Sequence, residues 1–463
     1  MIKSFRTSWF IAALLIIFLC CGTNCGKKKH RIKNDPHTKV LILGIDGATF
    51  SIIHPLISQG RLPHIKKLIK GGSYGILKSE LPMMSPALWT TIATGVGRQE
   101  HGIKEFINKD DRANPKLYDS NDRHVSALWN WMGLFRKTTG FVSWWASWPA
   151  EPVNGWMISD RMARSRWTEW TNADRSQNLT FPIGLADELK PLSVYASDPP
   201  MEEIHKLVQL TESEEKEFLA AEKPIRRHGL SVFKFSYCEQ RSYENISLYL
   251  LDKGQPDLTG VFLISNDPIS HTFWHFYEPD KFENVNPQDA KRLGQLIPNI
   301  YIHNDQFLEK LLQKLDSDTI VMIVSDHGFE ASGELPKDIS AEEFDGLRAE
   351  AVEKGVVAIG QSGQHSIDGV IIAYGGPIRK GIKINASIFD VTPTVLALMG
   401  LPVGKDMKGR VLEEIIDPEF PAQYPIQTIT SYEDLIGKTR GSSSGRANEQ
   451  EIIDKLRALG YIN

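Results

Sequence analysis

Cysteine is scarce in this chain of 463 residues: there are four, and three of them lie within the first 26 residues, at Cys20, Cys21 and Cys25. Once those residues are set aside, only Cys238 is left. The sequence therefore excludes an intrachain disulfide framework and a thiolate metal site. Any metal ion must be held by histidine and carboxylate, ligands that suit zinc, manganese and other divalent ions.

An excess of charge of one sign is also lacking. The formal net charge of -4 is small for this length, so nothing indicates a nucleic-acid polymer or a polybasic membrane surface as partner. The composition, 41% hydrophobic and 24% charged, is typical of a globular protein. The length permits a large core and suggests two or three domains.

A hydrophobic run long enough to cross a membrane comfortably is missing even at the N-terminus, where the apolar stretch covers only about residues 9–21. With basic residues before it, this stretch predicts a secretory signal within a leader of residues 1–26. The cysteines at its end suggest a lipoprotein, although Leu19 stands where a small residue is expected before Cys20. The basic stretch Lys27–Lys33 is also compatible with an uncleaved anchor. We expect export, to a periplasmic, membrane-anchored or secreted location.

Three apolar runs end at aspartate. Ile320–Val324 is rich in β-branched residues and is followed by Ser325, Asp326 and His327, which is typical of a strand buried on both faces of a parallel sheet. Val40–Asp46 and Val261–Asp267 are also apolar runs that end in aspartate. Ligands bind at the carboxyl ends of strands in open α/β sheets. Three carboxylates gathered there repel one another unless protons or cations neutralise them, so we expect metal ions.

Two histidines extend this set. His271 lies four residues after Asp267, so both share one face of a helix that begins at Asp267. His275, a further turn along, is expected to pack or cap. His365 lies in a glycine-rich loop, Gly363–Gly369, where a lone histidine is ordinarily a surface residue; with Asp267 and His271 lacking a third ligand, we predict that it binds metal.

Ser85 is the candidate nucleophile. The stretch SPALWTTIATG predicts a helix with Ser85 as N-cap, Pro86 as first helical residue and Gly95 at the C-terminal end. A cap alone would explain an isolated Ser-Pro pair. The functional alternative is a hydroxyl at the positive end of a helix, where backbone N–H groups favour an alkoxide or a phosphate.

Eight of the eleven tryptophans fall between Trp129 and Trp170. They predict either a bulky packing surface or an aromatic platform beside a substrate cleft. The more polar residues from about 164 onward carry helical runs, with a strand signal at Gly229–Cys238, and we interpret them as an inserted cap. The predicted organisation is a metal-hydrolase core at 38–163 and 256–420, a cap at 164–255 and an extension at 421–463. A helix is predicted at Ile300–Leu315.

The candidate site residues are Asp46, Ser85, Asp267, His271, Asp326, His327 and His365. They suffice for two divalent ions with mixed oxygen and nitrogen ligands. A pair of metal ions suits in-line displacement at phosphorus.

These motifs resemble those of the alkaline phosphatase superfamily, and within it the type I phosphodiesterase/nucleotide pyrophosphatase family. The matching pieces are GIDG at 44–47, SPALWTTIATG at 85–95, HGI at 101–103, NDPISH at 266–271, SDHG at 325–328 and GQH at 363–365. The resemblance implies an α/β, alkaline-phosphatase-like three-layer sandwich with a mostly parallel central sheet and an inserted cap region.

The resemblance also implies roles. Asp46, Asp326 and His327 would hold one ion beside Ser85, and Asp267, His271 and His365 the second, with Zn²⁺ the usual metal. Ser85 would attack phosphorus and form a phosphoserine, which water then hydrolyses.

One position departs from the family pattern. Nucleotide pyrophosphatases carry Asn three residues after the nucleophile, where this chain has Leu88, so a phosphoryl oxygen must be held by the helix N-terminus or elsewhere. The sulfatase signature fits worse, because Pro86 follows Ser85 directly and no arginine follows nearby.

Three functions remain open. The first is a metal-dependent hydrolase of small-molecule phosphate mono- or diesters. The second is a transferase that passes a phospho-substituent to an acceptor at the cell envelope. The third is a non-catalytic binding protein on the same scaffold, which the filled ligand positions disfavour.

Overall fold

The computed structural model describes residues 35–108, 116–163, 178–224, 229–335 and 361–436. The predicted leader at 1–26 and the end of the predicted extension, from residue 437 on, lie outside this part of the chain. Among the described residues, no helix is both long and apolar enough to span a membrane.

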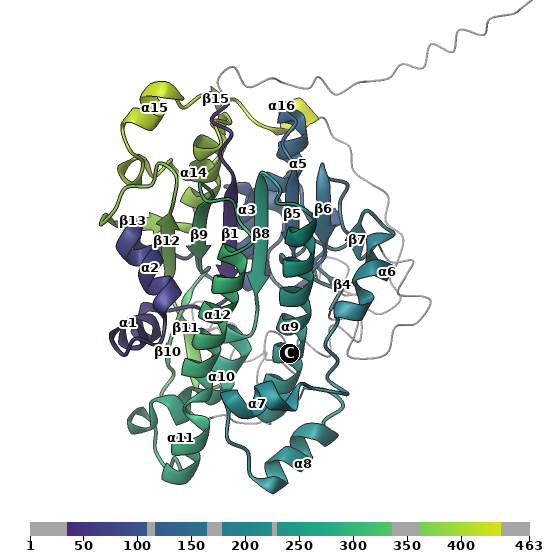
Figure 1. The fold of residues 1–463 in the computed structure, drawn as a ribbon, viewed down its shortest axis with the longest axis vertical. Coiled ribbons are helices and arrows are strands. Elements are labelled where there is room, and N and C mark those ends of the chain that lie inside the picture. The colour runs from purple at the N-terminus through teal and green to yellow at the C-terminus, as the bar shows by residue number, and fades with distance from the viewer. Residues whose placement is uncertain (1–34, 109–115, 164–177, 225–228, 336–360, 437–463) are drawn as a thin grey trace, which may run out of the picture.

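A nine-stranded sheet forms the centre of the molecule, in the order β13-β2-β12-β9-β1-β8-β5-β6-β7 (Figure 1). Neighbouring strands are parallel with two exceptions. β12 is antiparallel to both of its neighbours, β2 and β9, and β7 is antiparallel to β6. The strands are β1 (Val40–Ile45), β2 (Ser73–Lys78), β5 (Thr139–Val142), β6 (Gly155–Ile158), β7 (Thr180–Phe181), β8 (Leu258–Leu263), β9 (Ile320–Val324), β12 (Asp368–Tyr374) and β13 (Lys383–Ser387). The predicted mostly parallel α/β fold is confirmed.

The three strands that lead to aspartate are adjacent. β1 lies between β8 and β9 and pairs in parallel with both. All residues of these three strands are buried, as expected for strands covered on both faces. Their carboxyl ends therefore meet at one edge of the sheet.

Helices cover both faces of the sheet, which makes three layers. One face packs on α1 (Phe50–Ser58), α2 (Pro63–Gly71), α9 (Gly229–Lys253), α10 (Asn266–Tyr277) and α12 (Leu296–Leu312). The other face packs on α3 (Ser85–Thr94), α5 (Leu128–Met132) and α14 (Val391–Leu398). Alternate residues of β1 supply the two cores, because successive side chains of a strand point to opposite faces.

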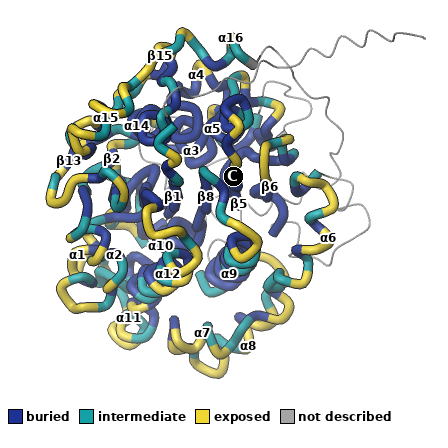
Figure 2. Tube along the Cα trace, turned by 45° about the horizontal axis from the view of Figure 1, so that its top comes forward, coloured by how far each residue is buried: buried dark blue, intermediate teal, exposed yellow. Residues whose placement is uncertain are grey.

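The remaining helices are shorter: α4 (Arg98–His101), α6 (Leu185–Leu189), α7 (Met201–Leu207), α8 (Glu212–Ala220), α11 (Pro287–Leu293), α15 (Glu419–Gln423) and α16 (Glu433–Ile436). Three pairs of short strands stand apart from the main sheet: β3 (Ile107–Asn108) with β4 (Lys116–Leu117), β10 (Gly328–Ala331) with β11 (Gly363–Ser366), and β14 (Val403–Gly404) with β15 (Thr428–Ile429). Figure 2 shows the central strands buried, whereas the helices α7, α8 and α11 carry exposed residues.

Four predicted elements differ from the structure. Residues Gly229–Cys238, which carried a strand signal, form the start of the 25-residue helix α9. The predicted helix Ile300–Leu315 begins earlier, at Leu296, and contains Pro298 in its first turn, where proline sacrifices no helical hydrogen bond. The predicted loop around His365 is strand β11. Helix α3 has Met84 as N-cap, so Ser85 is its first residue.

The residues predicted as a cap contact the sheet directly. β7 extends its edge beside β6, and α9 contacts β5, α10 and α12. The proposed division of the chain at 164 and 255 stays a prediction.

Candidate metal centre

The seven predicted site residues lie together at the carboxyl end of β1, β8 and β9. Asp46 follows β1, Asp267 and His271 stand in the first turns of α10 after β8, and Asp326 and His327 follow β9. His365 comes from β11 and Ser85 from the start of α3. All seven are buried, the most exposed being His365 at 6%.

Asp267 is the centre of the cluster. Its Oδ1 lies 3.0 Å from His365 Nε2, 3.4 Å from His271 Nε2 and 3.7 Å from His327 Nε2. The spacing of Asp267 and His271, one turn apart on α10, is the one expected from sequence. Asp267 therefore faces all three histidines at once.

Asp46 connects this group to the serine. The Ser85 hydroxyl donates to Asp46 Oδ1 at 3.5 Å, and His327 Nε2 lies 3.5 Å from the same oxygen. His327 Nε2 is also 3.5 Å from Asp326 Oδ2, and the Gly47 N–H donates to Asp326 Oδ1 at 3.5 Å. All four of these contacts are long for hydrogen bonds or ion pairs, at 3.5 Å.

Each histidine is oriented by a backbone carbonyl. The Nδ1 atoms of His271, His327 and His365 lie 2.8, 3.0 and 3.3 Å from the carbonyl oxygens of Gly363, Gly328 and Met83. An Nδ1–H that donates to a carbonyl leaves Nε2 without a proton, so its lone pair faces the cluster. Yet His365 Nε2 and His271 Nε2 are only 2.9 Å apart. Two facing lone pairs at that distance call for a proton or a cation between them.

The inward atoms fit divalent ions. Oδ2 of all three aspartates and Nε2 of His327 are buried without a hydrogen-bond partner among the described residues, and unpaired buried polar atoms are costly. Two groups of three residues have ligand atoms within 4.8 Å of one another: Asp267, His271 and His365, and Asp46, Asp267 and His327. The first matches the set expected from sequence. In the second, Asp267 stands where Asp326 was expected.

Burial also controls the protonation of these groups. It raises the pKa of Asp46 far above its usual range, reinforced by the negative charge of Asp326, and it raises the pKa of Asp326 to about 8. His271 and His365 overcome burial at Asp267 and hold its pKa below the usual range. Burial lowers the pKa of His327 and of His365. Burial therefore favours the neutral imidazole at His327 and His365 and, without cations, proton uptake by the carboxyls of Asp46 and Asp326.

Two residues that contact the site or the turn after Asp46 were not predicted from the sequence. Trp145, in the tryptophan-rich region, contacts Asp46 through its side chain and lowers the pKa of that carboxyl. Tyr301 of α12 accepts a hydrogen bond from the Thr49 N–H at 3.1 Å, in the turn after Asp46. Neither belongs to a motif, since each reaches the site only through the packing of distant segments. Leu88, at the position of the family's asparagine, is fully buried in the core.

The family model for type I phosphodiesterase/nucleotide pyrophosphatase matches residues 40–363, more than half of the chain. The chain belongs to this family. The resemblance inferred from the motifs is confirmed, and the chain is a phosphoric ester hydrolase by class. No curated protein sequence matches it.

Solved structures of the superfamily resemble this fold at low sequence identity. Wild-type alkaline phosphatase PafA is 12% identical, with 81% of this chain and 98% of that chain covered and a TM-score of 0.50. Human ectonucleotide pyrophosphatase/phosphodiesterase 5 is 14% identical over 82% of this chain and 100% of its own, with a TM-score of 0.44. Phosphonoacetate hydrolase from Sinorhizobium meliloti 1021 is 12% identical over 77% and 94%, also at 0.44. The likeness to PafA supports the alkaline-phosphatase-like fold.

Proposed function

We propose that this protein hydrolyses small-molecule phosphate esters, mono- or diesters, at a centre of two divalent ions, with Ser85 as the nucleophile. The observation that carries the proposal is the convergence of three aspartates and three histidines beside a serine hydroxyl, with Oδ2 of each aspartate and Nε2 of His327 buried without a hydrogen-bond partner among the described residues. Zn²⁺ is the proposed metal, because a mixed set of imidazole and carboxylate ligands suits it.

Asp267, His271 and His365 would hold one ion, and Asp46, Asp326 and His327 the other, with Asp267 close enough to serve both. Bound divalent ions would neutralise phosphoryl oxygens and favour the anionic form of the nucleophile.

Helix α3 and Asp46 position and activate the Ser85 hydroxyl in this proposal. Ser85 is the first residue of α3, a ten-residue helix, so its hydroxyl lies at the end where backbone N–H groups are unpaired. The Ser85 O–H directed at Asp46 Oδ1 gives the proton an acceptor when the oxygen attacks phosphorus. The new Ser85 Oγ–P bond forms as the ester bond to the leaving alcohol breaks. Water then attacks the phosphoserine, which releases the second product and restores the hydroxyl.

The helix N-terminus also replaces the missing asparagine in this proposal. Leu88 points into the core, so it offers no donor to the substrate. Backbone N–H groups at the start of α3 are the alternative donors for a phosphoryl oxygen. The neighbouring structure described as murine ectonucleotide pyrophosphatase/phosphodiesterase 5 in complex with AMP makes nucleotides one substrate class to assay.

Export is part of the proposal. It is supported by the apolar stretch at residues 9–21 and the cysteines that follow it. Labelling of the mature N-terminus in fractionated cells that express the full chain distinguishes a cleaved or lipidated leader from a retained anchor.

The nucleophile is tested with Ser85→Ala. We expect turnover of bis(p-nitrophenyl) phosphate to fall by more than about 10³-fold, because the attacking atom is gone, while bound metal stays at the wild-type level. Ser58→Ala, an exposed serine on α1, is the matched control and keeps full turnover. Retained turnover in Ser85→Ala would contradict the assignment. Product analysis with an added alcohol separates hydrolysis from transfer.

A further inference from the structure

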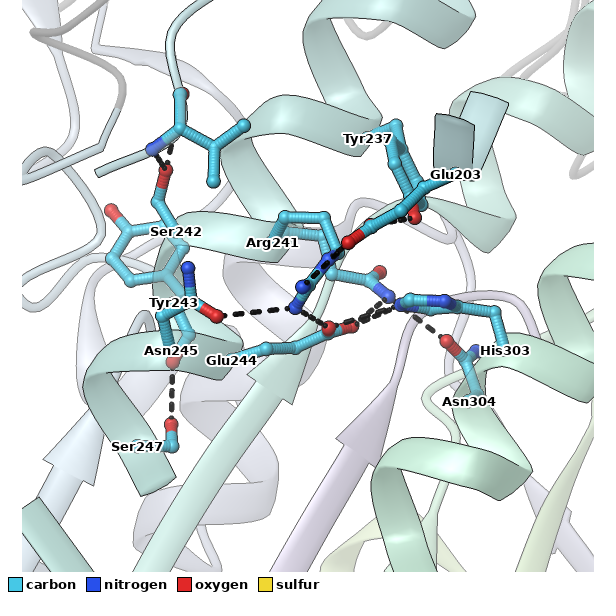
Figure 3. Close-up of polar contacts among 12 residues, drawn as sticks. Glu203, Tyr237, Arg241, Ser242, Tyr243, Glu244, Asn245, Ser247, His303 and Asn304 are labelled. Carbon is cyan, nitrogen blue, oxygen red and sulfur yellow. Dashed lines mark hydrogen bonds and ion pairs between the residues drawn. The ribbon is translucent and has the colours of Figure 1, made fainter. Parts of the chain in front are cut away.

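A polar network runs through the helical layer behind the metal centre. Glu244 of α9 is 1% exposed, and its carboxylate accepts hydrogen bonds from Arg241 at 2.8 Å and from Gln240 at 2.8 Å. It also lies 2.9 Å from His303 Nε2 of α12. These partners hold the pKa of Glu244 below its usual range despite burial. Figure 3 shows the group, with Arg241 linking Glu244 to Glu203 of α7.

The network ends beside the metal ligands. Gln240 Nε2 donates to Asn304 Oδ1 at 2.9 Å, and Gln240 Oε1 accepts from the backbone N–H of Ser265 at 2.9 Å. Asn304 Nδ2 in turn donates to Asn266 Oδ1 at 2.6 Å. Ser265 and Asn266 are the two residues directly before Asp267. The amides of Gln240 and Asn304 therefore hold the turn that places Asp267.

The same helix reaches the turn after Asp46. Tyr301 lies one turn before Asn304 on α12, is buried, and accepts from the Thr49 N–H at 3.1 Å. Its hydroxyl is 3.5 Å from the Gly47 carbonyl oxygen, to which it can donate. Tyr301 and Asn304 thus contact the turns that carry Asp46 and Asp267.

We propose that Tyr301 and Asn304 of α12 are positioning residues that set the separation of Asp46 and Asp267, and with it the affinity for the metal ions. The inference rests on the proposed two-ion centre and deepens it. A shift of either turn changes the distance between the carboxylates of Asp46 and Asp267, which both face His327. Residues that hold metal ligands in place commonly contribute about 10- to 100-fold to metal affinity. Neither residue touches the reacting atoms.

The test measures Zn²⁺ affinity by competition with a chromophoric chelator, together with kcat and KM for an aryl phosphodiester. Asn304→Ala is expected to weaken Zn²⁺ binding about 10- to 100-fold and to lower kcat more than KM changes. Asn304→Asp, which keeps the acceptor for Gln240 and loses the donor to Asn266, is expected to weaken it as well. Tyr301→Phe, which keeps the ring, is expected to weaken it several-fold.

Asn299→Ala is the matched control. Asn299 lies on the same helix and bonds to Leu207 and Arg61, away from the site, so its loss lowers thermal stability without changing Zn²⁺ affinity. A double-mutant cycle of Asn304→Ala and Asn266→Ala completes the test. Losses in Zn²⁺ affinity that are not additive show that Asn304 acts through Asn266. Additive losses overturn the proposal that Asn304 positions Asp267 through Asn266.

Unchanged Zn²⁺ affinity in Asn304→Ala and Tyr301→Phe, with stability lowered as in Asn299→Ala, overturns the inference and leaves the proposed function standing. A wild-type protein that binds no Zn²⁺ overturns the proposed function itself. The two failures are thus distinguishable.

Discussion

At the scale of single residues, the two histidines of α10 show why position matters more than residue type. His271 faces Asp267 and His365 through Nε2. His275, one turn further on, packs against Phe276 with its Nδ1 3.0 Å from the Ser362 hydroxyl. Burial lowers the pKa of His275 to about 4, so it is a neutral packing residue.

Replacing each of these histidines by alanine separates their roles. His271→Ala removes a ligand from the group of Asp267, His271 and His365, so we expect zinc content to fall from two ions to one per chain and turnover to fall at least about 100-fold. His275→Ala is the matched control, expected to keep both ions and to lose thermal stability. Elemental analysis of the purified variants gives the count. Two ions in His271→Ala would remove His271 from the ligand set.

The seven residues singled out from the sequence lie close together in the structure. Five of them follow β1, β8 or β9 directly or lie on the helix after β8, namely Asp46, Asp267, His271, Asp326 and His327. Their roles as nucleophile and metal ligands stay predictions. Asp46, Asp267 and Asp326 follow three adjacent parallel strands, a geometry that apolar runs ending in aspartate specify. Trp145 and Tyr301 were not found, because their contacts depend on how a loop and a helix pack across long sequence separations.

At the scale of elements, propensity and local context led to errors that tertiary structure explains. Gly229–Cys238 contains many aromatic and β-favouring residues, yet it continues into a 25-residue helix whose buried face packs on α10 and α12. β11 carries His365 because it pairs with β10. β10 ends at Ala331 and β11 begins at Gly363, so 31 residues separate the two paired strands, and a local analysis of the sequence does not reveal the pairing.

The close approach of β11 to α10 depends on Gly363. A Cβ at this position would lie 2.3 Å from the backbone oxygen of Ser270, next to His271, and the Gly363 carbonyl faces His271 Nδ1 at 2.8 Å. Any side chain must therefore push β11, and with it His365, away from α10.

Gly363→Ala is accordingly expected to destabilise the fold by about 1–3 kcal/mol, the usual cost of overpacking, and to weaken Zn²⁺ binding. Gly184→Ala is the control, since no atom lies within 4 Å of the added Cβ. Urea unfolding and chelator competition measure the two effects. A Gly363→Ala variant with wild-type stability and zinc affinity would show that the spacing of β11 and α10 is not critical.

At the scale of the whole molecule, the sheet brings into one place ligands that span 320 positions of the chain, from Asp46 to His365. The family resemblance anticipated this layout. It did not anticipate how the C-terminal segment closes the molecule: Tyr432 is 2% exposed, stacks on Trp131 with ring centroids 4.2 Å apart, and donates to the Pro402 carbonyl at 2.6 Å. A contact between such distant aromatic residues has no periodic signal in sequence.

The most direct measurement is the number of metal ions bound per chain in protein purified from zinc-supplemented buffer. We predict two Zn²⁺ per chain in the wild-type protein and in Ser85→Ala, and loss of both in Asp267→Ala, because Asp267 belongs to both ligand groups. A wild-type chain without bound metal would contradict the account.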